Sequence, residues 1–280
     1  MLRWIFRIII ALLVIAAVVA LFGYHEARQM PIVRRTAVGL PHWPQGAPPV
    51  TVALIADIHM QSATMDEARL GRIVAEVNAL HPDLVAIAGD FIQGRGRDEA
   101  ATALPILARQ LGKLQAPLGV VAVLGNHDHW TAPRAITSML TKAGMTVLDN
   151  GAIERGPLAI GGADDSFTKH ADVAATVAAM QRLPGARVML AHSPNVVHHL
   201  PADIHLLLAG HTHCGQVVLP LIGPPIDVAD PRYRCGMIRD PGRLTIVTAG
   251  LGTSDLPIRL GAPPDIWLVR LQPAPARSAR

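Results

Sequence analysis

Seven side chains of types that commonly bind metal ions follow apolar segments of this chain, at points where predicted strands end. They are Asp57, His59, Asp90, Asn126, His192, His211 and His213. The densest group lies in Gly210-His211-Thr212-His213-Cys214-Gly215, where two histidines are one residue apart. This segment follows the apolar run 204–209, and two imidazoles at a strand end can turn toward one metal ion.

The mixture of carboxylate, imidazole and amide ligands suits Mn, Fe or Zn better than Ca or Mg alone. One divalent ion takes about four to six ligands, so seven candidates are too many for one ion. Two ions that share a carboxylate fit the set better, and such pairs stabilise the attacking and leaving oxygens of a phosphoryl displacement. The residues therefore predict hydrolysis of a phosphate ester. Taken singly, Asp57, Asp90 and Asn126 are also explained as ordinary turn residues.

Alternating strands and helices must position these side chains. Apolar runs predict buried strands that end at the candidate ligands, at 50–56, 84–88, 119–124, 188–191 and 204–209. Apolar residues at helical spacing, with helix start signals such as Thr64-Met65-Asp66-Glu67, predict helices at 67–80, 99–114, 133–143 and 171–183. This alternation indicates an α/β fold with functional groups at the carboxyl ends of strands. A second sheet is expected from strands at 145–148, 158–161, 217–219, 244–248 and 266–271.

Over about residues 50–270, the order and spacing of five motifs resemble those of the calcineurin-like metallophosphoesterases. The motifs are Asp57-x-His59, Gly89-Asp90, Gly125-Asn126-His127-Asp128, His192 and Gly210-His211-x-His213. The longer segments 210–217, 250–254 and 257–259 resemble the branch with an N-terminal membrane segment. That branch includes transmembrane protein with metallophosphoesterase domain and membrane-linked UDP-2,3-diacylglucosamine pyrophosphatases.

The resemblance implies a four-layer α-β-β-α sandwich with two divalent metal ions and water as the nucleophile. It assigns the first ion to Asp57, His59, Asp90 and His213. It assigns the second ion to Asp90, Asn126, His192 and His211, with Asp90 bridging. His127 would face the substrate, and Asp128 would orient His127. Where the family often has a further charged residue after Gly-Asp, this chain reads Phe91-Ile92-Gln93-Gly94, which leaves the ligand set intact.

The N-terminal segment is the other informative stretch. Residues 8–22 are continuously apolar, and the span from Trp4 to Tyr24 is about the 20 residues needed to cross a bilayer. A cleaved signal peptide is the alternative, but its apolar core would be shorter, and no small-x-small cleavage site follows Leu21. We therefore predict a single-pass membrane anchor at residues 1–24 in a bacterial-type cell membrane.

Positive charges flank the anchor on both sides, so counting them does not decide which side the remaining chain faces. They are Arg3 and Arg7 before it, and Arg28, Arg34 and Arg35 after it. We expect an extended, proline-containing linker at 25–49, a catalytic domain at 50–272 and a disordered tail at 273–280.

Composition limits the expected partners. The 280-residue chain has a formal net charge of +4 without a basic run that contains aromatic residues, so nucleic acid is not an expected partner. A bilayer and a phosphorylated, amphiphilic small molecule are expected, and the branch resemblance suggests UDP-2,3-diacylglucosamine. The oligomeric state is not predicted. We expect the two cysteines, Cys214 and Cys235, to be unpaired, although one bridge is compatible with the sequence.

Several alternatives stay open at this point. The chain could be a catalytically silent, membrane-tethered metal scaffold, or a nuclease with a basic groove. The apolar segment 219–228 is either a buried loop or a rim that contacts acyl chains. His129 either lines the site or does not, whereas His198 and His199 are expected at the surface. The candidate phosphate contacts are Arg232, Arg234 and Arg259, because guanidinium binds phosphate. An ordinary solvent-exposed position is an equally good interpretation of each.

Overall fold

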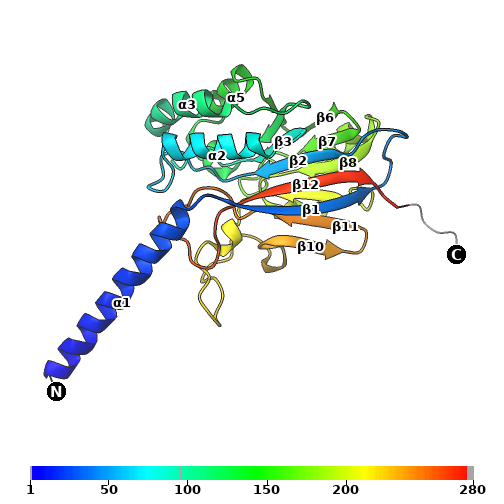
Figure 1. Cartoon of the computed structure of the whole chain (residues 1–280). Helices are drawn as coiled ribbons and strands as arrows, with labels where there is room; N and C mark the ends of the chain where they lie inside the picture. Colours follow the sequence, from blue (N-terminus) through cyan, green and yellow to red (C-terminus); the bar gives the residue numbers. More distant parts are fainter. Residues whose placement is uncertain (1, 95, 276–280) are drawn as a thin grey trace.

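The computed structural model describes residues 2–94 and 96–275, and within them two six-stranded sheets lie face to face (Figure 1). The first sheet contains β1 (Ile32–Leu40), β2 (Val50–Ile55), β3 (Leu84–Ala88), β4 (Val120–Val123), β5 (Thr146–Val147) and β12 (Asp265–Pro273). The second contains β6 (Gly151–Arg155), β7 (Leu158–Gly162), β8 (Ala186–Leu190), β9 (Leu206–Ala209), β10 (Gly236–Asp240) and β11 (Arg243–Val247). The strand orders are β1-β12-β2-β3-β4-β5 and β10-β11-β9-β8-β7-β6.

Helices cover the outer face of each sheet. The first sheet packs against α2 (Glu67–Ala79), α3 (Arg97–Leu111) and α5 (Pro133–Lys142). The second packs against α6 (Val173–Gln181) and the 3-10 helix η1 (Pro194–His199). Between the sheets, Leu54 of β2 and Leu208 of β9 belong to one buried apolar cluster. The four-layer α-β-β-α sandwich implied by the resemblance is thus confirmed.

The central strands have the apolar sequences expected of strands buried on both faces. All five residues of β3 are buried, and β3 pairs in parallel with β2 and β4. In the second sheet, β8 pairs in parallel with β9. Parallel pairing places the carboxyl ends of neighbouring strands at one edge of the sheet, where the candidate ligands follow.

The N-terminal helix α1 (Leu2–Arg28) projects from the sandwich and exposes its apolar side chains (Figure 1). Its length and its mean hydropathy of 3.0 fit a single-pass membrane anchor. The last turn contacts the domain, because Tyr24 Oη donates to Ala63 O at 3.3 Å and Arg28 pairs with Asp66 at 2.9 Å.

The expectation of an extended linker at 25–49 is wrong for much of that segment. Helix α1 continues to Arg28, and residues 32–40 form β1, which pairs in parallel with β12. Pro31 and Pro41 flank β1 without interrupting it, so the prolines mark the ends of a strand. The segment is therefore part of the folded domain.

Other differences concern short or polar elements. The edge strands β6 and β10 were not predicted, because their residues are half-exposed or exposed and lack an apolar run. The expected strand at 217–219 forms isolated bridges. Helix α2 is capped by Asp66, which accepts from Arg69 N at 2.8 Å, and not by Thr64. Of the expected tail, residues 276–280 lie outside the described residues, whereas Pro273 ends β12.

Candidate metal centre

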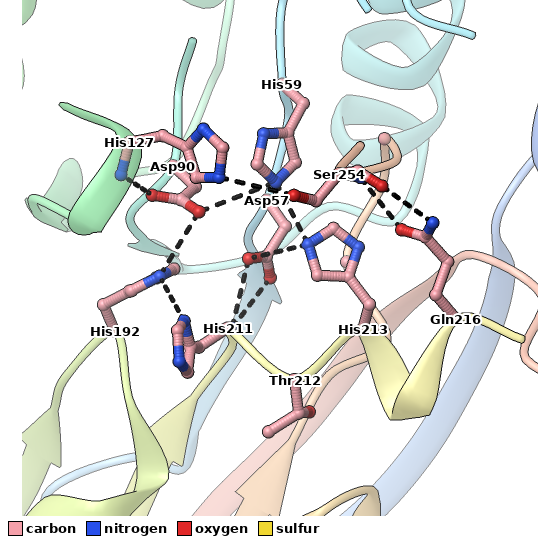
Figure 2. A network of polar contacts seen from close by, with 12 residues as sticks. Asp57, His59, Asp90, His127, His192, His211, Thr212, His213, Gln216 and Ser254 are labelled. Atoms are coloured by element: carbon pink, nitrogen blue, oxygen red, sulfur yellow. Dashed lines mark hydrogen bonds and ion pairs between the residues drawn. The ribbon is translucent and has the colours of Figure 1, made fainter. Parts of the chain in front are cut away.

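The candidate ligands converge where the carboxyl ends of strands from both sheets meet (Figure 2). The first sheet supplies four of them directly after β2, β3 and β4, namely Asp57, His59, Asp90 and Asn126. The second sheet supplies three after β8 and β9, namely His192, His211 and His213. All seven side chains are buried.

The donor atoms form two neighbouring groups. In one, His59 Nε2 lies 3.0 Å from His213 Nε2, which in turn lies 3.5 Å from Asp57 Oδ1. In the other, His192 Nε2 lies 2.9 Å from Asn126 Oδ1 and 3.1 Å from His211 Nδ1. Each group therefore presents imidazole and oxygen donors to one small volume.

Asp90 lies between the two groups. Its Oδ2 atom is 3.5 Å from His59 Nε2 and 3.4 Å from His192 Nε2. Its Oδ1 atom accepts a hydrogen bond from the backbone N–H of His127 at 2.9 Å. One oxygen of this carboxylate is thus nearly equidistant from both groups, which is the placement that a shared ligand needs.

These separations fit divalent metal ions. Two donors that are each about 2.1 Å from one ion lie about 3.0–3.4 Å apart at octahedral or tetrahedral angles. The protonation of two of the imidazoles also fits, because burial lowers the pKa of His59 to about 3 and that of His211 to about 4. Both are neutral at pH 7, the form that binds metals. The cluster can therefore hold divalent metal ions.

The carboxylates and His192 are coupled electrostatically. Burial raises the pKa of Asp57 to about 7. Burial also opposes ionisation of Asp90 and His192, but the attraction between this pair is stronger. It holds the pKa of Asp90 well below its usual range and raises that of His192 well above its own. His192 Nδ1 also contacts Ala88 O at 2.7 Å, which orients the ring.

The backbone is strained at this cluster. Positive φ angles of 47–72° occur at five of the ligands, namely Asp57, His59, Asp90, His211 and His213. Such angles cost non-glycine residues on the order of 1–3 kcal/mol and concentrate at functional sites. Close approach also explains two motif glycines, since a Cβ atom on Gly125 would lie 2.3 Å from Asp90 Oδ1, and one on Gly210 would lie 2.6 Å from Asp57 Oδ2.

Asp128 has different surroundings from those expected, so His127 is oriented by another partner. The Asp128 carboxylate does not orient His127; it accepts from the backbone N–H groups of Asp90, Phe91 and Gly125, each at 2.9 Å. His127 Nδ1 contacts Gln93 O at 2.8 Å, and His127 Nε2 lies 3.3 Å from Ser254 Oγ. Asp128 therefore fixes the turns that carry Asp90, and the Gln93 carbonyl orients His127. The residue types alone could not identify a backbone carbonyl as the partner that orients His127.

A cavity of about 330 Å³ opens onto this cluster. Asp90, Asn126, His127, His211 and His213 form its polar floor. Its other walls are largely apolar and include Trp130, Phe167, Ile226, Val228 and Leu256. Of these, Ile226 and Val228 belong to the segment 219–228, which is an exposed rim and not a buried loop. Sequence reasoning missed Trp130, in the short helix α4 (Asn126–Thr131), and Phe167, in a loop, because a single aromatic residue in such an element carries no periodic signal.

The candidate phosphate contacts are engaged elsewhere. Arg259 is fully buried and donates to the carbonyl oxygens of Ala249, Gly252 and Ala262 at 2.6–2.8 Å. Arg232 pairs with Asp240, and Arg234 pairs with Asp227 at 2.6 Å. His198 is exposed, as expected, and lies 3.2 Å from Asp230.

The two cysteines form a disulfide, which corrects the expectation that they are unpaired. The 3-10 helix η2 (His213–Gly215) contains Cys214, and Cys235 follows the 3-10 helix η3 (Pro231–Tyr233). Thr212 Oγ1 donates to Arg234 O at 2.6 Å and brings these segments together. The paired residues are 21 positions apart, and their spacing in the sequence does not reveal that the two segments are neighbours.

His129 is turned away from the cluster and pairs with Asp164 at 2.8 Å. Although burial opposes the charge on each, the pairing raises the pKa of His129 above 6.5 and lowers that of Asp164 below 3.8. We therefore expect the pair to contribute about 1 kcal/mol between pH 3.8 and 6.5. This contribution is lost as pH rises through the raised pKa of His129, and as pH falls through the lowered pKa of Asp164.

The measurement is the denaturant midpoint of the chain and of Asp164→Asn between pH 5.5 and 9. The stability difference between them should shrink as pH increases. The control is Asp203→Asn, which removes the partner of Arg187 (2.5 Å), and its effect should stay constant over this range. A difference for Asp164→Asn that is independent of pH would contradict the pairing.

The fold and cluster define a metallophosphoesterase, and comparison with known proteins supports this class. The model of the calcineurin-like phosphoesterase family matches residues 50–215. The chain belongs to this family, and the family and the His/Asp cluster together support two divalent metal ions.

Among its relatives, the chain is 31% identical over 228 residues to an uncharacterized metallophosphoesterase of Aquifex aeolicus, covering 78% of this chain and 83% of that protein. It is 28% identical over 291 residues to the transmembrane protein with metallophosphoesterase domain of Danio rerio, covering 96% of this chain. The chain spans 64% of the length of that relative. A crystal structure of a dimetal phosphatase from Danio rerio is 14% identical, with a TM-score of 0.49 over 73% of this chain and 88% of that one.

Proposed function

We propose that this chain is a dinuclear-metal phosphoesterase that hydrolyses a phosphodiester or pyrophosphate bond. The observation that carries the proposal is the position of Asp90 Oδ2, which is within 3.5 Å of imidazole nitrogens from both donor groups. One ion would be held by Asp57, His59, Asp90 and His213, and the other by Asp90, Asn126, His192 and His211. The mixed donors suit Mn, Fe or Zn.

Two divalent cations held by these residues would neutralise the anionic ester and would lower the pKa of water toward neutrality. Among the chain's own residues, His127 is placed to transfer a proton. Its Nδ1–H donates to the Gln93 carbonyl, which leaves Nε2 directed toward the cavity beside Ser254. In the imidazolium form, Nε2–H would protonate the leaving oxygen.

The cavity favours an amphiphilic substrate over a nucleic acid. Its apolar wall can contact acyl or other apolar groups, and none of the described residues that line it is arginine or lysine. UDP-2,3-diacylglucosamine, cleaved to UMP and the lipid monophosphate, is the first lipid-linked pyrophosphate to assay. Helix α1 would hold the enzyme in a bacterial-type cell membrane.

The test is hydrolysis of bis-p-nitrophenyl phosphate by the full chain in detergent with added Mn. We expect turnover that is lost with EDTA and restored by Mn, with about two metal ions per chain. Two bound ions without turnover of this diester or of UDP-2,3-diacylglucosamine would support the catalytically silent scaffold. Faster hydrolysis of single-stranded or duplex DNA than of either compound would support the nuclease.

A further inference from the structure

Residues 219–228, which we call the rim loop, place apolar side chains in solvent beside the cavity. Leu221 is fully exposed, Ile222 is 78% exposed and Ile226 is 72% exposed. The tip is an ordered turn, because Leu219 O accepts from the N–H groups of Ile222 (3.2 Å) and Gly223 (2.9 Å). Residues 219–226 contain no charged side chain. An exposed apolar surface of this kind marks an interaction site.

The base of the rim loop is tied to the end of α1 through one short segment. Leu260 N donates to Gln216 O at 2.9 Å, and Val218 N donates to Leu260 O at 2.8 Å. The preceding residue, Arg259, donates its N–H to Gly23 O in α1 at 2.9 Å. The loop and the helix end are therefore held by adjacent residues of the same segment.

Further contacts fix the direction in which α1 leaves the domain. Arg69 is buried and donates to Gln29 O at 3.0 Å, in addition to the contacts of Tyr24 and Arg28. Helix α1 and the rim loop project from the same side of the domain (Figure 1). Since the apolar part of α1 is exposed and long enough to cross a bilayer, a bilayer around it would lie on the side of the rim loop.

We propose that the rim loop inserts into the surface of the bilayer that α1 crosses, and that the cavity takes a lipid phosphodiester or pyrophosphate from that bilayer. The proposal rests on the proposed function and adds its substrate class. Ile226 and Val228 belong to both the loop and the cavity wall, so acyl chains would follow them from the bilayer. The phosphate would lie over the polar floor beside His127.

A lipid ester with the same leaving group as the soluble diester tests this proposal. The probe is phosphatidyl-p-nitrophenol in phosphatidylcholine vesicles that carry the full chain. Water adds to phosphorus while the bond from phosphorus to the nitrophenyl oxygen breaks, which releases phosphatidic acid and p-nitrophenol. The oxygen of water remains on phosphorus as a hydroxyl group. The other proton of water goes to the nitrophenyl oxygen, which leaves as p-nitrophenol.

The variant Leu221→Asn/Ile222→Asp places polar groups at the tip, and asparagine tolerates the φ of 66° at position 221. We expect it to lower lipid-probe hydrolysis at least about tenfold. Hydrolysis of bis-p-nitrophenyl phosphate should stay within about twofold, because neither residue lines the cavity. Leu221→Met/Ile222→Leu keeps the tip apolar and should behave as the wild type. An equal rate on the lipid probe in the polar variant would overturn the proposal, whereas no hydrolysis of either ester by the wild type would overturn the proposed function itself.

Fluorescence gives a readout that does not depend on catalysis. Ile222→Trp should gain tryptophan emission that brominated phosphatidylcholine quenches, relative to the wild-type chain in the same vesicles. Glu154→Trp, in β6 at the far side of the domain, should gain emission that is not quenched (Figure 1). Equal quenching of the two variants would show that the rim loop lies outside the bilayer.

The disulfide carries a second, independent inference. Cys214 and Cys235 are the chain's only cysteines, and their disulfide closes the segment that contains the rim loop. Disulfides persist in oxidising compartments and are rare in the cytosol. We infer from the disulfide that the catalytic domain faces the oxidising side of the membrane, which places Arg3 and Arg7 on the cytoplasmic side.

Thiol labelling in intact cells tests this orientation. A polymer-linked maleimide that cannot cross membranes should label the full chain after treatment with an impermeant reductant, and should not label it without reductant. Labelling without reductant, or labelling that requires cell lysis, would overturn the inference. The expected result would also exclude substrates confined to the cytoplasm.

Discussion

Replacement of Asp90 by asparagine should abolish ester hydrolysis and weaken binding of the metal pair. Asp90 Oδ2 lies 3.5 Å and 3.4 Å from imidazole nitrogens of the two donor groups, so one substitution affects both. Stabilisation of transition-state charge by a metal ion is worth several kcal/mol, so we expect kcat/KM for bis-p-nitrophenyl phosphate to fall about a thousandfold or more. The measurement combines steady-state kinetics with metal content after gel filtration.

Asparagine is chosen because it keeps an acceptor for the backbone N–H of His127, which an alanine would leave unpaired. Asp172→Ala serves as the control. This residue caps α6 by accepting from Ala175 N at 2.8 Å, so its loss removes a comparable backbone contact outside the metal cluster. The control should keep kcat and both metal ions. Full metal content together with normal turnover in Asp90→Asn would refute the shared-ligand role.

Much of the site was predictable because its signals are local. Apolar runs such as 84–88 identify strands buried on both faces, and a polar residue directly after such a run marks a carboxyl end. Because β2 and β3 pair in parallel, their carboxyl ends, which Asp57 and Asp90 follow, lie at one edge of the sheet. The second sheet contributes His192 and His211 in the same way, through the parallel pair β8 and β9.

The features that sequence reasoning missed depend on distant partners. Strand β1 lies in a proline-containing segment, and its neighbour in the sheet, β12, is at the opposite end of the chain. The disulfide requires η2 and η3 to be neighbours, and the surroundings of His127 involve the backbone of Gln93. None of these contacts leaves a pattern in the residues that make it. Hydrophobic periodicity indicates which residues of a segment are buried, but it does not indicate which distant segment they contact.

The largest effect without loss of metal is expected for His127→Ala. The imidazole lies in the cavity, where Gln93 O fixes Nδ1 and leaves Nε2 toward the substrate. Removing a proton donor of this kind lowers kcat by about a hundredfold to ten-thousandfold. His129→Ala, two residues further along helix α4 (Asn126–Thr131), is the matched control, because that ring pairs with Asp164 and should not affect turnover.

The leaving group distinguishes proton transfer from simple charge stabilisation by His127. Phenol itself has a pKa near 10, so its departure benefits from a proton donor, whereas the more acidic p-nitrophenol needs less help. If His127 donates the proton, His127→Ala should slow hydrolysis of a phenyl phosphodiester more than hydrolysis of bis-p-nitrophenyl phosphate. Added imidazole should then restore part of the lost rate. Equal losses on both esters would assign His127 to charge stabilisation instead. Because His127 also forms a potential metal-binding group with His59 and Asp90, loss of one metal ion in His127→Ala would make it a ligand and remove it from proton transfer altogether.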